Sequence, residues 1–307
     1  MTMNLDLRHR ERAKRLKENL LGWGLILPAV LIIIGICIVP IIQTFLYSLQ
    51  YYKLTEPNKT HYIGFANYAD IFSSPSFYHN LKNTAIFTVF SVSLELVLGL
   101  IAALLMNGLR RGVSAVRTSI LIPWCLPGIV VGQMFKFIFD GQYGLINSIM
   151  KHVGLLGEVE SFAFLSKVGW AMGAVIIADA WKQFPFVALL LLAGLQVISK
   201  DLYEAADVDG ATKIRQFFHI TLPLIKPMIM VAVVFRTMSA IRIFDIVYSM
   251  TSGGPANTTS TILYTSYTLL FGDLNYGKGS AMAFVIFAII FVITMLYLRL
   301  MDGSDSN

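Results

Sequence analysis

Polar and aromatic side chains recur at helical spacing inside two long apolar segments. They are Asp179, Gln183 and Phe186 in the first segment, and Arg236, Ala240 and Ile243 in the second. Steps of three and four residues place each set on one face of a helix. Hydrogen-bonding groups beside an aromatic ring suit the hydroxyls and apolar faces of a sugar ring. The pattern therefore predicts that the two faces bind a hydroxyl-rich solute in a common cavity.

The charged members of these segments allow a second interpretation. An ionisable side chain at membrane depth is expensive and requires a polar cavity or an opposite charge. Asp179 and Arg236 satisfy this requirement equally well as a buried ion pair that fixes the helix bundle, with Lys182 extending toward the membrane surface. Glu95, in another apolar segment, is expected to pack against a neighbouring hydroxyl. The sequence leaves the solute-binding and structural roles open.

No arrangement of residues in the sequence predicts catalysis. The five histidines are far apart, and none forms a pair at the spacing of metal ligands. The stretch from Gly272 to Lys278 imitates a phosphate-binding loop, but Gly279 stands where Ser or Thr is required. We therefore expect the chain not to be an enzyme, and we expect no cofactor or metal in it.

The composition is that of a membrane protein. Apolar residues make up 56% of the 307 positions and charged residues 14%, against about 25% charged in soluble domains. In lipid, an apolar run must close its own backbone hydrogen bonds and so becomes a helix. The sequence predicts an all-α membrane protein with six spans, at about 21–48, 83–107, 116–139, 168–192, 222–246 and 279–300.

Lysine and arginine are distributed unevenly between the connections. The basic residues are concentrated in the first 20 residues, in the second-to-third connection and in the fourth-to-fifth connection. Such segments stay in the cytoplasm. Both termini are therefore predicted to be cytoplasmic. The expected organisation is a basic cytoplasmic tail (1–20), a six-helix transmembrane domain (21–300) and a polar cytoplasmic tail (301–307). Membrane orientation accounts for the net charge of +6, and we expect no nucleic acid partner.

The fourth-to-fifth connection, about 199–221, reads as helix, turn, helix. Ser199 is a suitable cap for the first helix and Gly210 suits the left-handed position that ends it. Pro223 is then placed at the start of the fifth span, where its missing amide does no harm. This short amphipathic unit has the shape of a segment that docks in a groove of another protein, although an ordinary interfacial helix fits the same pattern.

The sequence of this loop resembles that of a known protein family. Glu204-Ala205-Ala206, Asp209-Gly210-Ala211 and Ile220 to Pro223 are similar to the signature loop in the membrane subunits of binding-protein-dependent ABC importers. In that family the loop is the coupling helix that docks on the ATPase subunit. The resemblance assigns this role to Tyr203, Glu204, Ala205, Ala206, Asp209, Gly210, Ala211, Phe217, Phe218 and Pro223.

Further segments resemble the carbohydrate branch of the family, the permeases for maltose, trehalose and glycerol phosphate, and the first of its two permeases. They are Gly64 to Tyr68, Gly141 to Asn147, Trp181 to Pro185, Ala193 to Gln196 and Phe244 to Pro255. The resemblance implies the type I ABC importer permease fold and places Asp179, Lys182, Gln183, Phe186, Arg236, Ser239, Ala240 and Ile243 at the midplane sugar site. Ala240 and Ile243 lack the polar groups found there in the maltose type.

The resemblance also implies a location in the inner membrane of a bacterial or archaeal cell, a mechanism and a set of partners. It makes the 21–300 region a permease domain. A sugar, such as maltose or trehalose, would cross by alternating access. The partners would be a second, homologous permease, a dimeric cytoplasmic ATPase that binds ATP and Mg²⁺, an extracytoplasmic solute-binding protein and the membrane lipid. The alternative is an ion-coupled secondary transporter, which also uses intramembrane Asp and Arg.

Overall fold

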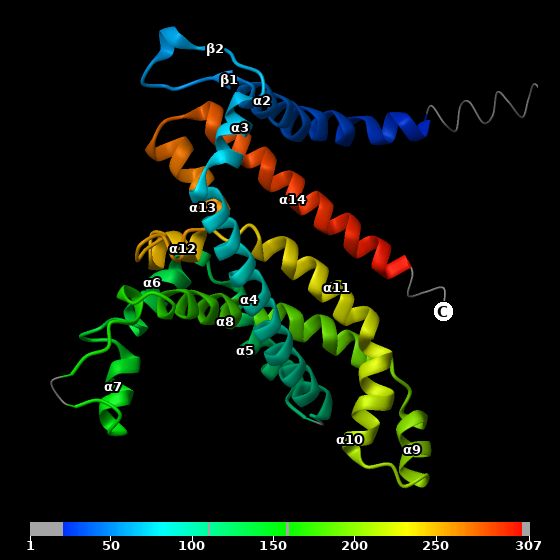
Figure 1. Ribbon diagram of the computed structural model, residues 1–307. Helices are drawn as coiled ribbons and strands as arrows, with labels where there is room; N and C mark the ends of the chain where they lie inside the picture. The colour runs from blue at the N-terminus through cyan, green and yellow to red at the C-terminus, as the bar shows by residue number, and fades with distance from the viewer. Residues whose placement is uncertain (1–20, 110, 158–159, 303–307) are drawn as a thin grey trace, which may run out of the picture.

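The computed structural model describes residues 21–109, 111–157 and 160–302. Outside this range lie residues 1–20, 110, 158–159 and 303–307. They include the basic tail and Arg110, which carry part of the lysine and arginine on which the predicted orientation rests. The described chain is a helical membrane bundle with one small ribbon of two strands. Figure 1 shows the first span and α14 running side by side along one edge of the bundle, with α4 crossing toward α8.

Five helices in the described residues are long and apolar enough to cross a membrane, and a bent pair makes up a sixth span. They are Leu21–Ser48, which ends as α2 (Val39–Ser48); α4 (Pro75–Gly108); the pair α5 (Val113–Cys125) and α6 (Gly128–Ile138); α8 (Trp170–Val197); Lys213–Ala240, made of α10 (Lys213–Gln216), a π-helical turn (Phe217–Thr221) and α11 (Leu222–Ala240); and α14 (Tyr276–Asp302). The prediction of six apolar spans in an all-α protein is confirmed.

The third span differs from its predicted form. We expected a single helix over 116–139, but α5 and α6 meet at an angle of 90°. Pro127 disfavours the helical conformation at the residue before it, and Leu126 is extended, with φ −74° and ψ 139°. The break therefore follows from one proline that the sequence analysis did not take into account.

The fifth span begins about ten residues before its predicted start. Its helix is capped by Thr212, whose hydroxyl accepts from the Arg215 amide, and it runs without interruption through the π-helical turn into α11. Pro223 therefore lies inside a continuous helix and does not open one. The expectation that Pro223 marks the start of the span was wrong.

Shorter elements gather at the ends of the spans. They are β1 (Gln50–Tyr51) and β2 (His61–Tyr62), paired antiparallel; α3 (Ala66–Ser73); α7 (Leu145–His152); α9 (Lys200–Val208); α12 (Asp245–Met250); and α13 (Ile262–Tyr267). In Figure 1 the ribbon, α7 and α13 lie at one end of the bundle. The start of the first span, the end of α14, α9 and α10 lie at the other end. The two described ends of the chain therefore share a side with α9.

Buried amides fasten the end of the bundle that carries the ribbon. Asn83 donates to the carbonyls of Asn257 and Ser260, at 2.9 and 3.0 Å. Asn67 donates to the carbonyls of Ser48 and Gln50, at 2.8 and 2.9 Å. Each side chain satisfies carbonyls that regular helices leave unpaired. These bonds tie α3 and α4 to the segments that follow the first and fifth spans.

The core of the bundle is the contact between α4 and α8. At Gly99 of α4, an added Cβ would lie 2.6 Å from Val187 Cγ1 and 3.1 Å from the Ala188 nitrogen of α8. Val187 and Ala188 are both fully buried. Small residues at such a crossing let two backbones approach closely, which is how helices associate in lipid.

Gly99→Ala is therefore expected to destabilise the protein by about 1–3 kcal/mol, the usual cost of overpacking. Thermal unfolding of the purified membrane protein measures the change. Gly173→Ala in α8 is the matched control, because nothing lies within 4 Å of its added Cβ. The control should leave the unfolding temperature unchanged or raise it, and equal losses in both variants would contradict the close crossing.

Candidate functional site

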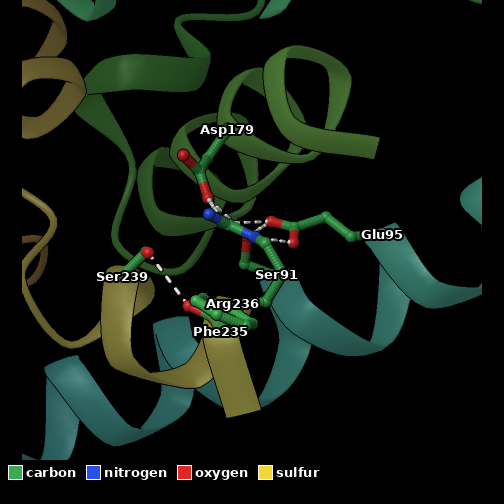
Figure 2. Close-up of polar contacts among 6 residues, drawn as sticks. All are labelled: Ser91, Glu95, Asp179, Phe235, Arg236 and Ser239. Carbon is green, nitrogen blue, oxygen red and sulfur yellow. Dashed lines mark hydrogen bonds and ion pairs between the residues drawn. The ribbon is translucent and has the colours of Figure 1, made fainter. Parts of the chain in front are cut away.

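An ion-pair cluster joins three spans at the centre of the bundle. Arg236 of α11 is 4% exposed and lies between Glu95 of α4, 0% exposed, and Asp179 of α8, 2% exposed. Its guanidinium donates to both carboxylate oxygens of Glu95, with Nη2 2.7 Å from Oε1, and to Asp179 Oδ2 at 3.1 Å. Figure 2 shows the three side chains converging from their helices. Both carboxyl groups thereby have the same guanidinium as their partner inside the apolar segments.

Ser91 completes the cluster one helical turn before Glu95. Its hydroxyl oxygen lies 2.8 Å from Glu95 Oε1 and 2.8 Å from Asp179 Oδ2 (Figure 2). The predicted hydroxyl partner of Glu95 is therefore present. The prediction missed the pairing of Glu95 with Arg236, because 141 residues separate the two in the sequence.

A polar cavity of about 150 Å³ opens beside this cluster. It is lined by Gly128, Asp179, Lys182, Gln183, Arg236, Ser239, Arg242, Ile243, Phe244, Asp245 and Ile246. Six of the eight residues predicted for solute binding are in this set. Asp179 and Arg236 thus belong both to the ion-pair cluster and to the cavity wall. Their positions fit the structural ion pair and also the predicted solute-binding role.

The remaining two predicted residues lie elsewhere. Ala240 is buried in the core with 1% exposure. Phe186 stacks on Trp124, with ring centroids 6.1 Å apart, and contacts Phe235 edge-on. The aromatic residue in the cavity wall is Phe244, whereas the predicted one was Phe186.

Asp245 and Gly128 are cavity residues that the sequence analysis did not select. An added Cβ at Gly128 would lie 2.7 Å from Asp245 Cβ, so only glycine fits there. This contact brings the start of α6 against the start of α12. The helical-face argument did not reach these residues, because both lie at the first turn of a helix that follows a break.

The loop between α8 and α11 folds as predicted, as a helix, a turn and a second helix. The Ser199 hydroxyl accepts from the Asp201 amide at 3.3 Å, and Gly210 has φ +73°. Glu204, Asp209 and Gly210 are exposed. Figure 1 shows α9 beside α10 at the tip of the bundle, away from the other helices.

A polar brace ties α9 to the fifth span. The Asp207 carboxylate accepts from Lys213 Nζ at 2.8 and 3.0 Å and from Gln216 Nε2 at 2.5 Å. The hydrogen bonds from Lys213 and Gln216 lower the pKa of Asp207, so the carboxylate stays ionised at neutral pH. Tyr203 and Thr221 add a hydroxyl contact of 2.9 Å. As a result α9 is attached to the helix that carries Arg236.

Apolar side chains on this unit face outward. Val208 is 89% exposed, Ile214 73% and Phe218 57%. Phe217, which is half-buried, packs edge-on against the Phe218 ring. We call the exposed Val208, Ile214 and Phe218 the apolar patch of the loop. Exposed apolar side chains on a projecting unit are typical of a protein interaction site.

Metal ligation is not a feature of the described part of the chain. No three His, Cys, Asp or Glu side chains gather there in a group that could hold a metal ion. The arrangement in these residues is instead a polar cavity between spans, joined through one helix to a projecting loop. Fold and site together define a multi-pass membrane transport protein.

Comparison with known proteins gives the family. Residues 95–305 match the binding-protein-dependent transport system inner membrane component family. The chain belongs to this family and is a transmembrane permease of the ABC importer type. The expected fold class, the type I permease fold, is confirmed.

Two relatives are similar over nearly their full lengths. The sulfoquinovosyl glycerol transport system permease of Agrobacterium fabrum is 39% identical, covering 94% of this chain and 93% of its own. The trehalose/maltose transport system permease of Thermococcus litoralis is 38% identical, covering 92% and 94%. In a crystal structure of a bacterial ABC transporter that imports the acidic polysaccharide alginate, one chain superposes with a TM-score of 0.79. It is 23% identical, and 94% of this chain and 96% of that chain are covered.

Arg236→Met is expected to destabilise the folded protein by about 3–5 kcal/mol, because it leaves two buried carboxylates without their cation. Lys182→Met is the control, since Lys182 lines the same cavity but has no ion pair in the described chain. The control should cost less than about 1 kcal/mol. Thermal unfolding of the two purified variants measures the difference, and equal stability would show that the cluster does not hold the bundle together.

Proposed function

We propose that this chain is the permease subunit of an ATP-driven importer for a di- or oligosaccharide, such as maltose or trehalose. The observation that carries the proposal is the continuous helix Lys213–Ala240, which joins the projecting loop at one end to the polar cavity at the other. Motion applied at the loop is thereby delivered to the residues that would contact the solute. The family of the chain supports the same assignment.

In this proposal the loop docks on a cytoplasmic ATPase dimer that binds ATP and Mg²⁺. The apolar patch of Val208, Ile214 and Phe218 supports docking, and Glu204 and Asp209 form its acidic rim. The loop and both termini would then be cytoplasmic, in agreement with the distribution of lysine and arginine. The opposite end, with the β1–β2 ribbon and α7, would receive the solute from an extracytoplasmic binding protein.

A second, homologous permease completes the proposed channel. One chain contributes a cavity of about 150 Å³, with hydrogen-bonding groups from α8, α11 and the segment that follows α11, and the ring of Phe244. Such a wall suits one side of a sugar, and the partner would supply the other. The names of the relatives, which refer to trehalose, maltose and sulfoquinovosyl glycerol, support a sugar as the solute.

Glu204→Lys tests the docking role. The substitution reverses a charge in the proposed interface and is expected to lower ATP-driven uptake and recovery of the ATPase with the permease at least about tenfold, equivalent to about 1.4 kcal/mol of binding. Gly210→Pro should do the same, because proline requires a negative φ where Gly210 has +73°. Uptake into membrane vesicles and co-purification measure the two effects.

Asp273→Lys is the matched control, since Asp273 is also exposed but lies at the opposite end of the bundle. It should leave ATPase recovery unchanged. Normal uptake and ATPase recovery in both loop variants would refute the docking role. Uptake that follows a proton or sodium gradient and needs no ATP would instead identify an ion-coupled transporter.

Gln183→Leu tests the sugar-binding wall. Loss of one hydrogen-bonding amide is expected to raise the KM for sugar uptake about tenfold, in line with about 1.5 kcal/mol per hydrogen bond, while the amount of assembled complex stays the same. Uptake of labelled trehalose or maltose gives the KM. Phe186→Leu, outside the cavity wall, is the comparison, and an unchanged KM in Gln183→Leu would exclude this cavity as the sugar site.

A further inference from the structure

Four aromatic side chains stack in a row beside the polar cavity. Phe244 and Tyr248 stand four residues apart at the start of α12. Tyr267 ends α13, and Phe271 lies four residues later, in the π-helical turn Thr268–Gly272. A spacing of four residues places each pair on one helical face. We call these four residues the aromatic ladder.

The two pairs of the ladder meet at Tyr267. Its ring centroid lies 4.7 Å from that of Phe244 and 5.5 Å from that of Tyr248. The ring of Phe271 follows at 5.0 Å. The ladder therefore runs without a gap from a residue of the polar cavity to the π-helical turn beyond α13.

One hydroxyl group fixes the ladder, while its outer rings remain accessible. Thr261 donates to the carbonyl of Ile243, the residue before Phe244, at 3.2 Å. Because Thr261 also caps α13, this bond sets α13 against the start of α12. Phe271 is 61% exposed and Tyr248 is 41% exposed. The rings are thus held in position by the fold and still present open faces.

The ladder lines a second cavity that adjoins the first. This second cavity has a volume of about 390 Å³ and is lined by Arg242, Phe244, Asp245, Leu263, Ser266, Tyr267, Leu270 and Phe271. Arg242, Phe244 and Asp245 line both cavities. The two cavities therefore meet at one aromatic ring, one cation and one carboxylate.

Size and chemistry together indicate what the second cavity holds. Sites for small molecules usually enclose about 300–1,000 Å³, and the first cavity, at about 150 Å³, falls below this range by itself. Arg242 and Asp245 make the second cavity unsuitable for a lipid chain, because charges against hydrocarbon are costly. Aromatic faces with hydroxyl groups beside them suit the apolar faces and the hydroxyls of a sugar ring.

We propose that the second cavity is a second sugar subsite. Tyr267 and Phe271 stack on one ring of the solute, while Gln183 and Ser239 bind the neighbouring ring in the first cavity. The proposal rests on the transport function proposed above and adds to it a preference for solutes of at least two rings. In Figure 1 α13 lies between α12 and the β1–β2 ribbon, so the subsite is on the side from which the solute would arrive.

Saturation-transfer NMR titrations of the purified, lipid-reconstituted permease complex, without a binding protein, test the subsite. The probes are methyl α-glucoside, which has one ring, and maltose and trehalose, which have two. The wild type is expected to bind a two-ring sugar about tenfold more tightly than the one-ring sugar, the effect of one favourable aromatic contact. Tyr267→Leu and Phe271→Leu should each reduce this ratio to about twofold or less and leave the Kd of methyl α-glucoside unchanged.

Two further variants separate stacking from folding. Tyr267→Phe keeps the aromatic face and should keep the preference for two rings. Phe65→Leu is the matched control for Phe271→Leu, because Phe65 is 67% exposed but lies outside both cavities. It should leave both dissociation constants as in the wild type, and size-exclusion chromatography shows whether each variant is folded.

The possible failures of the two proposals are distinct. A two-ring preference that persists in both leucine variants would overturn the second subsite and leave the sugar site in the first cavity standing, as expected if a lipid or the partner permease covers the ladder. Equal weakening of one-ring and two-ring sugars would assign the ladder a structural role and overturn the subsite as well. A wild type that binds none of the three sugars would overturn the proposed function itself.

Discussion

A charge that is buried in lipid must find its counter-charge within the protein, and this constraint organises the centre of the bundle. Arg236 satisfies it with Glu95 and Asp179, so three spans are held in one relative position by a single guanidinium. The tight crossing of α4 and α8 at Gly99 brings the two carboxylates close enough to share that partner. Because the pairing is costly to break and has no substitute in lipid, the cavity beside it keeps a defined wall.

The fifth span connects this centre to the projecting loop. Its helix is capped by Thr212 beside the loop and carries Arg236 near its other end. Asp207 and Tyr203 attach the loop helix to the start of the same span. This chain therefore contains, in one helix, part of the exposed apolar surface of the loop and a wall of the polar cavity. The π-helical turn at Phe217–Thr221 lies between them.

Because lipid forces apolar runs into helices, periodicity and composition were sufficient to predict that there are six spans and that residues of the fourth and fifth spans line the cavity. Phe186 and Ala240, however, do not line it. The structure of the loop could be predicted equally well, because Ser199 and Gly210 act on the backbone next to them. Contacts between residues that are distant in sequence could not be predicted. Glu95 meets Arg236 only through the packing of α4 against α11, and Phe186 turned toward Trp124 because the bend at Leu126 and Pro127 placed α5 beside it. Asp245 entered the cavity through the break between α11 and α12, which no helical repeat signals.

The first span differs from the others in how little of it the rest of the chain covers. None of its most apolar 18-residue window is buried within the described structure, and it meets α14 at contacts such as Phe45 with Phe284. Within this chain, most of this helix is therefore constrained in hydrophobicity and length and not in shape. Exchanges among Leu, Ile, Val and Phe along it leave the packing inside the chain as it is, whereas a larger residue at Gly99 requires a smaller one at Val187.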